Sequence, residues 1–216
     1  MSKIQSGHHA AYEKLLDLLS NHQLKPGQIL SQKELVELAG MTLSPVRLAL
    51  ARLETEGIVT ILPQHGIKLV EPSLDLFKNL LQIRITIEKE AWSQFAVNTP
   101  ENVFDEMIAA QESFLKECEG PMSDALLAEI TRYDQGMHKM VVEAMGNDRL
   151  TEMFRVLNVT INFLRADRGD LRPNNARNSV SVHLEMLHAA KKREIWQLVE
   201  IVERHILNAT RVLLAV

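Results

Sequence analysis

One aspartate and one histidine, Asp134 and His138, lie four positions apart in a stretch that otherwise has the spacing of a buried helix face. Apolar residues recur there every three or four positions, so the carboxylate and the imidazole share the apolar face of a predicted helix. The stripe consists of Leu127, Ile130, Asp134, His138, Val141 and Met145. Because an isolated buried carboxylate is costly, another group should meet Asp134 inside the fold.

Two further histidines, His183 and His205, occupy the same kind of place in two later stripes. These stripes are Ala176, Val180, His183, Leu187 and Ala190, and Leu198, Ile201, Val202, His205, Ala209 and Val212. One carboxylate and three imidazoles are common ligands of divalent metal ions. Spacing alone does not bring three helices together, and a core histidine is more often hydrogen-bonded than metal-bound. A shared metal site, ordinary packing and an internal Asp–His pair are therefore all open at this point.

The composition is that of a globular protein with room for two domains. The chain has 216 residues, 46% of them hydrophobic, and a net charge of -4. Its apolar runs stay short of the roughly 18 residues that a membrane helix needs, and its first residues lack the apolar centre of a signal peptide. We therefore expect a cytoplasmic protein without a membrane partner. Cys118 is the only cysteine, which excludes an intrachain disulfide and a thiolate metal cluster.

Short helices with clear end signals are predicted in the first third of the chain. A helix over about 10–21 ends before the Pro26-Gly27 pair. A second helix extends to about residue 39, with Ser31 as its N-cap, Glu34 completing a capping box and Gly40 ending it.

The third helix begins at Thr42 or Ser44 and runs to about Thr55. Residues 58–61 and 67–70 then form a β-hairpin pattern. Three helices followed by a hairpin predict a winged helix-turn-helix, whose third helix packs on one side and can read a DNA groove with the other. A winged-helix module that never meets DNA has the same pattern. Charges balance over residues 1–71, so DNA binding there must use a few placed residues and a dimer.

The remainder of the chain, after a linker at residues 71–73, predicts an all-α bundle. The expected helices are 74–97, 101–118, 123–145, 148–168, 175–191 and 193–214. Trp92 and Trp196 are interpreted as core anchors. The expected fold class is mainly α, with a winged helix-turn-helix domain over 1–72 and a six-helix bundle over 73–216.

Five short runs near the N-terminus form a recognisable pattern. They are Leu24–Leu30, Lys33–Leu35, Ser44–Leu50, Leu53–Val59 and His65-Gly66. Together they closely resemble the DNA-binding domain of GntR-family bacterial transcription regulators over about residues 10–70. The resemblance implies a phosphate contact from Lys33 and wing-tip contacts from His65-Gly66. The groove contacts that it implies come from Thr42, Ser44 and Arg47.

Leu43 is a departure from that family, whose members usually carry arginine just before the recognition helix. Leucine cannot donate a hydrogen bond to a base or phosphate. It can touch a thymine methyl group or extend the packed face through Val46 and Leu50. The operator sequence therefore does not follow from the resemblance.

The second part of the chain resembles the helical effector domain, called FCD, of the FadR branch of this family. The matching marks are Arg84, Glu88, Ala91, the Asp134/His138 pair, Gly146-Asn147, His183 and His205. The resemblance implies a divalent metal bound by Asp134, His138, His183 and His205, zinc first and nickel, manganese or iron as alternatives. It also implies a small organic acid effector beside the ion. Arg84 is expected either to clamp that acid or to pair with Glu88, and Asn178 is a further pocket residue.

We therefore expect a ligand-responsive transcription regulator that binds double-stranded operator DNA as a homodimer. It is expected not to be an enzyme. One alternative keeps DNA binding but makes the metal purely structural. The other is a metal-dependent hydrolase or isomerase in which an open metal position activates water, although the sequence shows no further catalytic motif.

Overall fold

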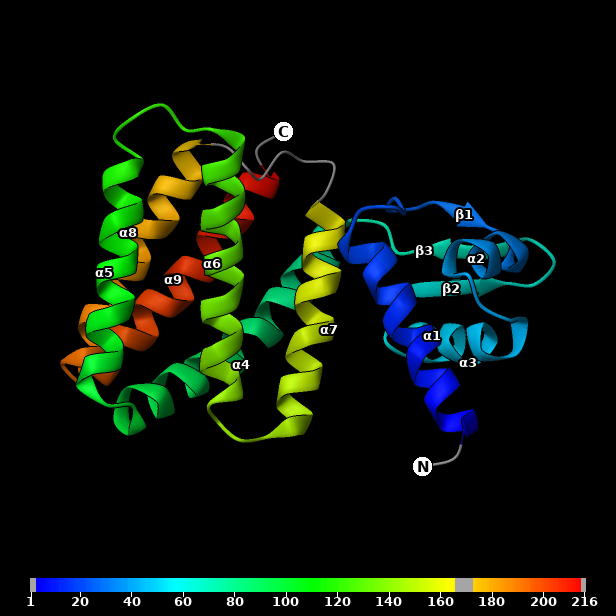
Figure 1. Cartoon of the computed structure of the whole chain (residues 1–216), viewed down its shortest axis with the longest axis horizontal. Helices are drawn as coiled ribbons and strands as arrows, with labels where there is room; N and C mark the ends of the chain where they lie inside the picture. The colour runs from blue at the N-terminus through cyan, green and yellow to red at the C-terminus, as the bar shows by residue number, and fades with distance from the viewer. Residues whose placement is uncertain (1–2, 166–172, 215–216) are drawn as a thin grey trace. The chain divides into compact units, whose positions relative to one another are not determined.

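The computed structural model describes residues 3–165 and 173–214, and it is mainly α-helical (Figure 1). The chain divides into two compact units. The first unit runs up to Leu76 and includes the part of helix α7 (Asp148–Arg165) that begins at Asn158. The second unit consists of the other helical residues, from Phe77 to Leu157 and in the two C-terminal helices. The predicted fold class, a winged helix-turn-helix followed by a helical bundle, is confirmed. The boundary expected between residues 72 and 73 falls in the irregular segment that precedes the first bundle helix.

The first unit contains the expected helices, but the first of them begins at Lys3 and not near residue 10. Its elements are α1 (Lys3–Ser20), β1 (Ile29–Leu30), α2 (Gln32–Ala39), α3 (Leu43–Thr55), β2 (Val59–Leu62) and β3 (Gly66–Leu69). The predicted capping box is present, since the Ser31 hydroxyl accepts from the Glu34 backbone N–H and the Glu34 carboxylate accepts from Ser31 N–H. Gly40 ends α2 in the left-handed conformation. Thr42 is the N-cap of α3, without a side-chain hydrogen bond.

The wing is a three-stranded antiparallel sheet in the order β1-β3-β2. Thr60 of β2 lies opposite Lys68 of β3, and Leu30 of β1 lies opposite Ile67. Strand β1 was not predicted, because two residues are too few to show an alternating pattern. Gly66 has a φ of 101°, and a Cβ atom there would lie 2.5 Å from the Leu30 carbonyl oxygen. Glycine at this position therefore lets β1 approach β3.

Apolar side chains of α1, α2 and α3 form the core of the first unit together with the sheet. Leu15, Leu35, Leu50 and Ile67 are almost completely buried. Burying such side chains stabilises the unit by roughly 1.5–3 kcal/mol each. This core fixes α3 with one face inward and leaves its opposite face to solvent.

The second unit is built from long helices. They are α4 (Leu74–Asn98), α5 (Glu101–Glu117), α6 (Asp124–Glu143), α7 as far as Leu157, α8 (Pro173–Lys191) and α9 (Ile195–Leu214). Helix α8 is central, because it packs against α5, α6 and α9. The predicted bounds agree with these helices to within a few residues. Most of the polar stretch predicted between Arg168 and Asn175, and the side chains of Ala209 and Val212, lie outside the described residues.

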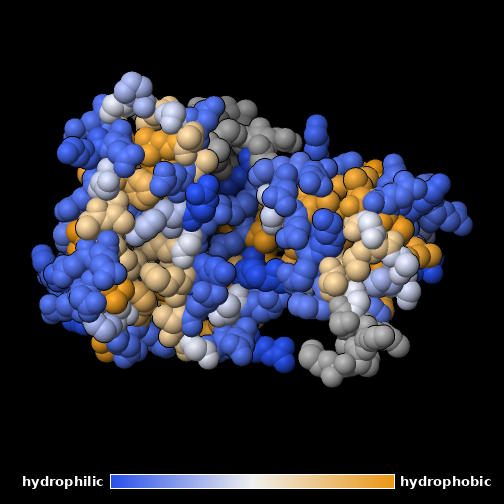
Figure 2. Space-filling model, viewed as in Figure 1, coloured by the Kyte–Doolittle hydropathy of each residue, from blue (hydrophilic) through white to orange (hydrophobic). Residues whose placement is uncertain are grey.

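The surface is mostly hydrophilic on the face shown in Figure 2, with smaller hydrophobic patches. One aromatic residue departs from expectation: Trp92 is fully buried, but Trp196 is 79% exposed. The prediction of Trp196 as a core anchor is wrong, because the buried stripe of α9 begins at Leu198 and lies on the other side of the helix. Among the helices of the described part, none combines the length and apolarity needed to cross a bilayer.

Candidate metal centre and DNA-binding surface

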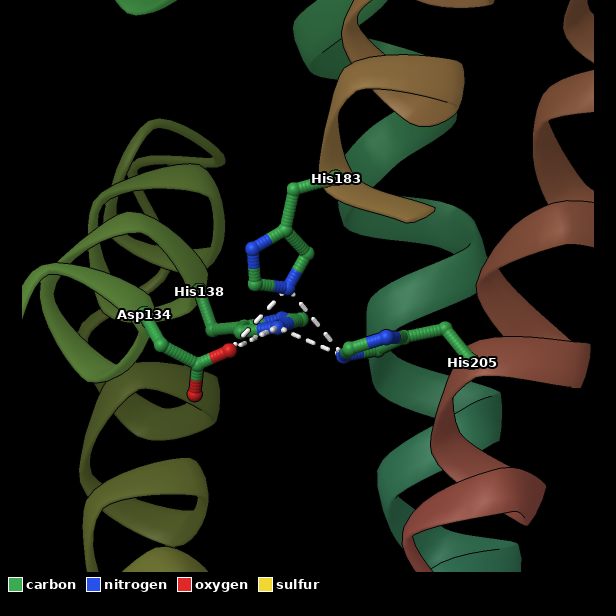
Figure 3. Close-up of side chains that lie close together, drawn as sticks. All are labelled: Asp134, His138, His183 and His205. Carbon is green, nitrogen blue, oxygen red and sulfur yellow. Dashed lines mark hydrogen bonds and ion pairs between the residues drawn. The ribbon is translucent and has the colours of Figure 1, made fainter. Parts of the chain in front are cut away.

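Four predicted ligands from three helices point toward one another in the second unit (Figure 3). Asp134 and His138 come from α6, His183 from α8 and His205 from α9. One ligand atom from each, an aspartate oxygen or a ring nitrogen, lies within 4.8 Å of the others. His138 and His183 are buried, whereas the Asp134 side chain keeps 27% of its surface exposed. The cluster is therefore closed at His138 and His183, and partly exposed at Asp134 and His205.

Four of the separations between these atoms lie in the range found for two ligands of one ion. His205 Nε2 lies 3.2 Å from His138 Nε2 and 3.3 Å from His183 Nε2. Asp134 Oδ1 lies 3.0 Å from His183 Nε2 and 3.9 Å from His138 Nε2. Two ligands bonded to one zinc ion at about 2.1 Å each are separated by roughly 3–4.2 Å, depending on the angle between the bonds. Three imidazoles and one carboxylate in this arrangement fit a divalent ion.

A buried chain of charged groups holds His138 in the orientation that metal binding requires. His138 Nδ1 is hydrogen-bonded to Glu88 Oε2, and Glu88 Oε1 accepts from Arg84 Nε at 2.5 Å. Glu88 is fully buried on α4. An ionised carboxylate only accepts, so the imidazole hydrogen must sit on Nδ1 and the Nε2 lone pair faces the other ligands.

The electrostatics of the cluster favour the protonation states of metal ligands. Burial would raise the pKa of Asp134, but its hydrogen bond and charge interaction with His183 hold it well below the ordinary value. Burial lowers the pKa of His183 and outweighs its interaction with Asp134. Burial, together with His183 and His138 nearby, holds the pKa of His205 well below normal. The lowered pKa values favour an ionised carboxylate on Asp134 and neutral imidazoles on His183 and His205, which are the forms that bind metal.

His183 has two further polar neighbours. Ser179 Oγ donates to Asp134 Oδ1 at 3.2 Å and lies 3.5 Å from His183 Nε2. Gln111 of α5 places its side-chain nitrogen 3.4 Å from His183 Nδ1. Gln111 is buried, and its Oε1 has no hydrogen-bond partner among the described residues.

The two predicted effector residues are placed differently. Arg84 is buried near the cluster. Desolvation alone would lower its pKa, but the negative charges of Glu88 and Asp134 outweigh this effect and raise the pKa above the ordinary value. Its Nε is committed to Glu88, while among the described residues no hydrogen bond is formed by its two terminal nitrogens. Asn178 is exposed on α8, next to Ser179. The structure thus brings Arg84 to the cluster and leaves Asn178 at the surface.

The predicted DNA contacts lie on the exposed side of the winged helix. Ser44 and Arg47 are exposed on α3, and Arg47 Nε donates to Gln32 Oε1 of α2 at 3.0 Å. Lys33 is exposed on α2, and His65 is exposed in the turn between β2 and β3. Leu43 is 43% exposed, so it does not extend the packed face of α3.

Three residues around the cluster were missed as metal-site residues by sequence reasoning: Glu88 as the partner of His138, and Gln111 and Ser179 as neighbours of the other ligands. A signal existed for two of them, because Glu88 and Gln111 interrupt buried apolar stripes just as Asp134 does. The stripes are Phe77, Leu81, Arg84, Glu88, Ala91 and Phe95 in α4, and Phe104, Met107, Gln111 and Phe114 in α5, with Cys118 directly after that helix. Ser179 carries no comparable signal.

This chain is similar to known transcription regulators both in sequence and in structure. Two regulators are similar to it in sequence. One is an uncharacterized HTH-type transcriptional regulator, YdhC, of Bacillus subtilis (strain 168). It is 26% identical over 156 residues, which cover 71% of this chain and 67% of that protein. The other, an uncharacterized HTH-type transcriptional regulator from the TAR-I ttuE-ttuC' intergenic region of Agrobacterium vitis, is 31% identical over 88 residues, covering 41% of this chain and 52% of that protein.

Among solved structures, E. coli McbR/YncC has a TM-score of 0.75 at 21% identity, covering 99% of this chain and 98% of its own. A putative transcriptional regulator GntR from Rhodococcus sp. RHA1 has a TM-score of 0.72 at 14% identity, covering 98% of this chain and 99% of its own. At these identities the structures show a shared fold.

Family models account for both parts of the chain. The model of the bacterial regulatory proteins of the gntR family matches residues 8–69, and the FCD domain model matches residues 79–208. The first match covers the winged helix, and the second covers every ligand of the candidate metal centre. This chain therefore belongs to the GntR family of DNA-binding transcription regulators, in the branch that carries an FCD effector domain, and is not an enzyme.

Proposed function

We propose that this regulator senses a small carboxylic acid at a divalent metal ion, zinc first among the candidates, and that the acid changes its affinity for operator DNA. The observation that carries the proposal is the convergence of Asp134, His138, His183 and His205, with ligand atoms within 4.8 Å of one another. These four side chains would hold the ion. Bound there, the ion supplies a Lewis-acidic position for an anionic oxygen.

The charge balance of the site favours an anionic ligand. A divalent ion brings two positive charges, which the ionised carboxylates of Asp134 and Glu88 cancel. Arg84 adds one more positive charge beside them, so the loaded site carries a net charge of about +1 in a largely buried place. A monoanionic carboxylate neutralises this charge.

The exposure of the cluster and the hydrogen-bond donors of Arg84 both support binding of an acid beside the ion. Asp134 and His205 are the partly exposed ligands, and the terminal nitrogens of Arg84, which form no hydrogen bond among the described residues, are planar donors suited to a carboxylate. Arg84 would therefore orient the acid while the ion binds its oxygen. Asn178 stays a weaker proposal, as an outer residue at the mouth of the site.

DNA reading is proposed to use the exposed face of α3. Ser44 and Arg47 would enter the major groove, with Thr42 at its edge, Lys33 at a phosphate, and the His65-Gly66 turn at the wing tip. One winged helix covers only a short half-site, so we propose a cytoplasmic homodimer on a pseudo-palindromic operator. The acid acts only if it binds the free and the operator-bound protein with different affinity.

The test begins with metal analysis and native mass spectrometry of the purified protein, to identify the ion and any acid that remains bound. Operator DNA selected in vitro by the protein is then titrated with and without candidate acids. We expect the effective acid to change operator affinity by about 5- to 150-fold, the usual span of coupling energies. Identical operator affinity with every acid that binds the metal-loaded protein would overturn the sensing proposal.

Chelation separates a sensing ion from a structural one. If the ion is part of the sensor, removing it abolishes acid binding while the helical circular dichroism signal and the dimer remain. If the ion is structural, chelation unfolds the bundle or dissociates the dimer. Either result leaves the family assignment unchanged.

A further inference from the structure

Gln111 is a buried amide that the candidate metal centre does not use as a ligand. Its Nε2 lies 3.4 Å from His183 Nδ1 and 4.0 Å from Met137 Sδ, and its Oε1 has no hydrogen-bond partner in the described residues. A thioether is only a weak acceptor. The ring nitrogen of His183 is therefore the main polar neighbour of this side chain.

His183 can carry its ring hydrogen on either nitrogen, and the two forms need different neighbours. With the hydrogen on Nε2, His183 donates to Asp134 Oδ1 at 3.0 Å, and Nδ1 accepts from the Gln111 NH₂ group. With Nε2 bound to a metal ion, the hydrogen must sit on Nδ1, which then needs an acceptor. A glutamine amide provides that acceptor by turning about its last side-chain bond, because its carbonyl then takes the place of its NH₂ group.

We infer that Gln111 is a positioning residue that serves both forms of His183, donating to Nδ1 in the metal-free protein and accepting from Nδ1–H in the metal-bound protein. This inference rests on the proposed metal function. It explains why a neutral amide stands on the buried stripe of α5, where Met107 and Phe114 are its apolar neighbours in the stripe.

The contrast with His138 makes the role specific. Glu88 can only accept, so His138 keeps its hydrogen on Nδ1 whether or not an ion is bound. His138 is thus preset for the ion, whereas His183 must change form when the ion binds. Ser179 Oγ, at 3.5 Å from His183 Nε2, lies at the other ring nitrogen and cannot replace Gln111.

Nuclear magnetic resonance of the full chain, labelled with ¹⁵N-histidine, tests the inference without an activity assay. Ring spectra are recorded before and after one equivalent of Zn²⁺, with signals assigned by single His→Gln variants. We expect His183 to change from the Nε2–H to the Nδ1–H form, while His138 stays Nδ1–H throughout. An Nδ1–H form of His183 in the metal-free protein would overturn the inference.

Two substitutions give an independent readout in Zn²⁺ affinity, measured by competition with a chromophoric chelator. Gln111→Met keeps the size of the side chain but removes the acceptor, and should weaken Zn²⁺ binding by about 10- to 100-fold. Gln111→Glu keeps an acceptor, should place His183 in the Nδ1–H form before metal is added, and should bind Zn²⁺ at least as tightly as the unmodified protein. Gln82→Met, at an exposed position of α4, is the matched control and should leave the affinity unchanged.

A folded Gln111→Met variant that loses less than about tenfold in affinity would overturn the inference. If that variant does not fold, Gln111→Glu decides, because weaker Zn²⁺ binding than in the unmodified protein contradicts the acceptor role. Failure of the proposed function looks different, since the unmodified protein would then bind no Zn²⁺ at all.

Discussion

Replacing Glu88 by glutamine should destabilise the bundle strongly, because it leaves Arg84 buried without the counter-charge that is hydrogen-bonded to it. Glu88 is fully buried between Arg84 and His138 and hydrogen-bonded to both. Glutamine has nearly the same shape and still offers His138 an acceptor. The substitution therefore removes one negative charge and also the acceptor for Arg84 Nε, toward which the glutamine NH₂ group would turn.

The magnitude follows from the pKa of Glu88. Burial would raise that pKa, but the charges and hydrogen bonds of His138 and Arg84 bring it down from 4.5 to about 2. This difference corresponds to roughly 3 kcal/mol in favour of the ionised carboxylate. It agrees with the loss of about 3–5 kcal/mol found when one partner of a buried ion pair is removed. For a domain of this size the expected fall in melting temperature is roughly 6–12 °C.

The assay is urea and thermal unfolding at neutral pH, followed by circular dichroism with a chelator present, so that metal binding does not contribute. Glu90→Gln is the matched control, because Glu90 lies on the exposed side of the same helix. That control should change the free energy of unfolding by no more than about 0.5 kcal/mol.

A second variant distinguishes an unpaired charge from a packing defect. Adding Arg84→Met to Glu88→Gln removes the unpaired charge and should recover about 1 kcal/mol or more. The reasoning is refuted if Glu88→Gln is no more destabilising than Glu90→Gln, or if the double variant is less stable than the single one.

Three further predictions address the other parts of the molecule. Arg47→Ala should weaken specific operator binding by about 1–3 kcal/mol, measured by fluorescence anisotropy, with unchanged metal content; unchanged operator specificity would contradict its place in the groove. His183→Ala should lose the bound metal, measured by elemental analysis, yet still bind operator DNA in the absence of acid. The control is His188→Ala, at an exposed position of the same helix, which should keep its metal. Equal metal content in the two variants would show that His183 is not a ligand. Gly66→Ala should lower the free energy of unfolding by about 1–3 kcal/mol, since its new Cβ would meet the Leu30 carbonyl oxygen at 2.5 Å. Gly57→Ala, also at positive φ but with open space around it, should cost less in the same urea titration, and the opposite order would contradict the packing argument.

Local sequence signals determined the elements and one half of the candidate metal centre. The capping box of α2 and the glycine that ends it act within a few residues, so their pattern predicts the helix directly. Asp134 and His138 belong to one helix, so their spacing alone places them on the same face. Periodicity made His183 and His205 candidate ligands, but it left a shared site open, since it defines the face of each helix and not which helices meet. The family resemblance then implied that the four residues bind one ion.

The tertiary structure decided the contacts that give the site its chemistry. Glu88 reaches His138 and Gln111 reaches His183 only because α4 and α5 pack against the ligand helices, fifty or more positions away in the chain. The exposure of Trp196 likewise depends on how α9 is turned in the bundle. The sequence by itself determined which residue types lie on each helix face, because that depends on the period of the backbone. Which faces meet depends on the packing of whole helices. The fold therefore decided which ring nitrogen of His138 carries the hydrogen, that Arg84 pairs with Glu88, and that the Asp134 side chain is partly exposed.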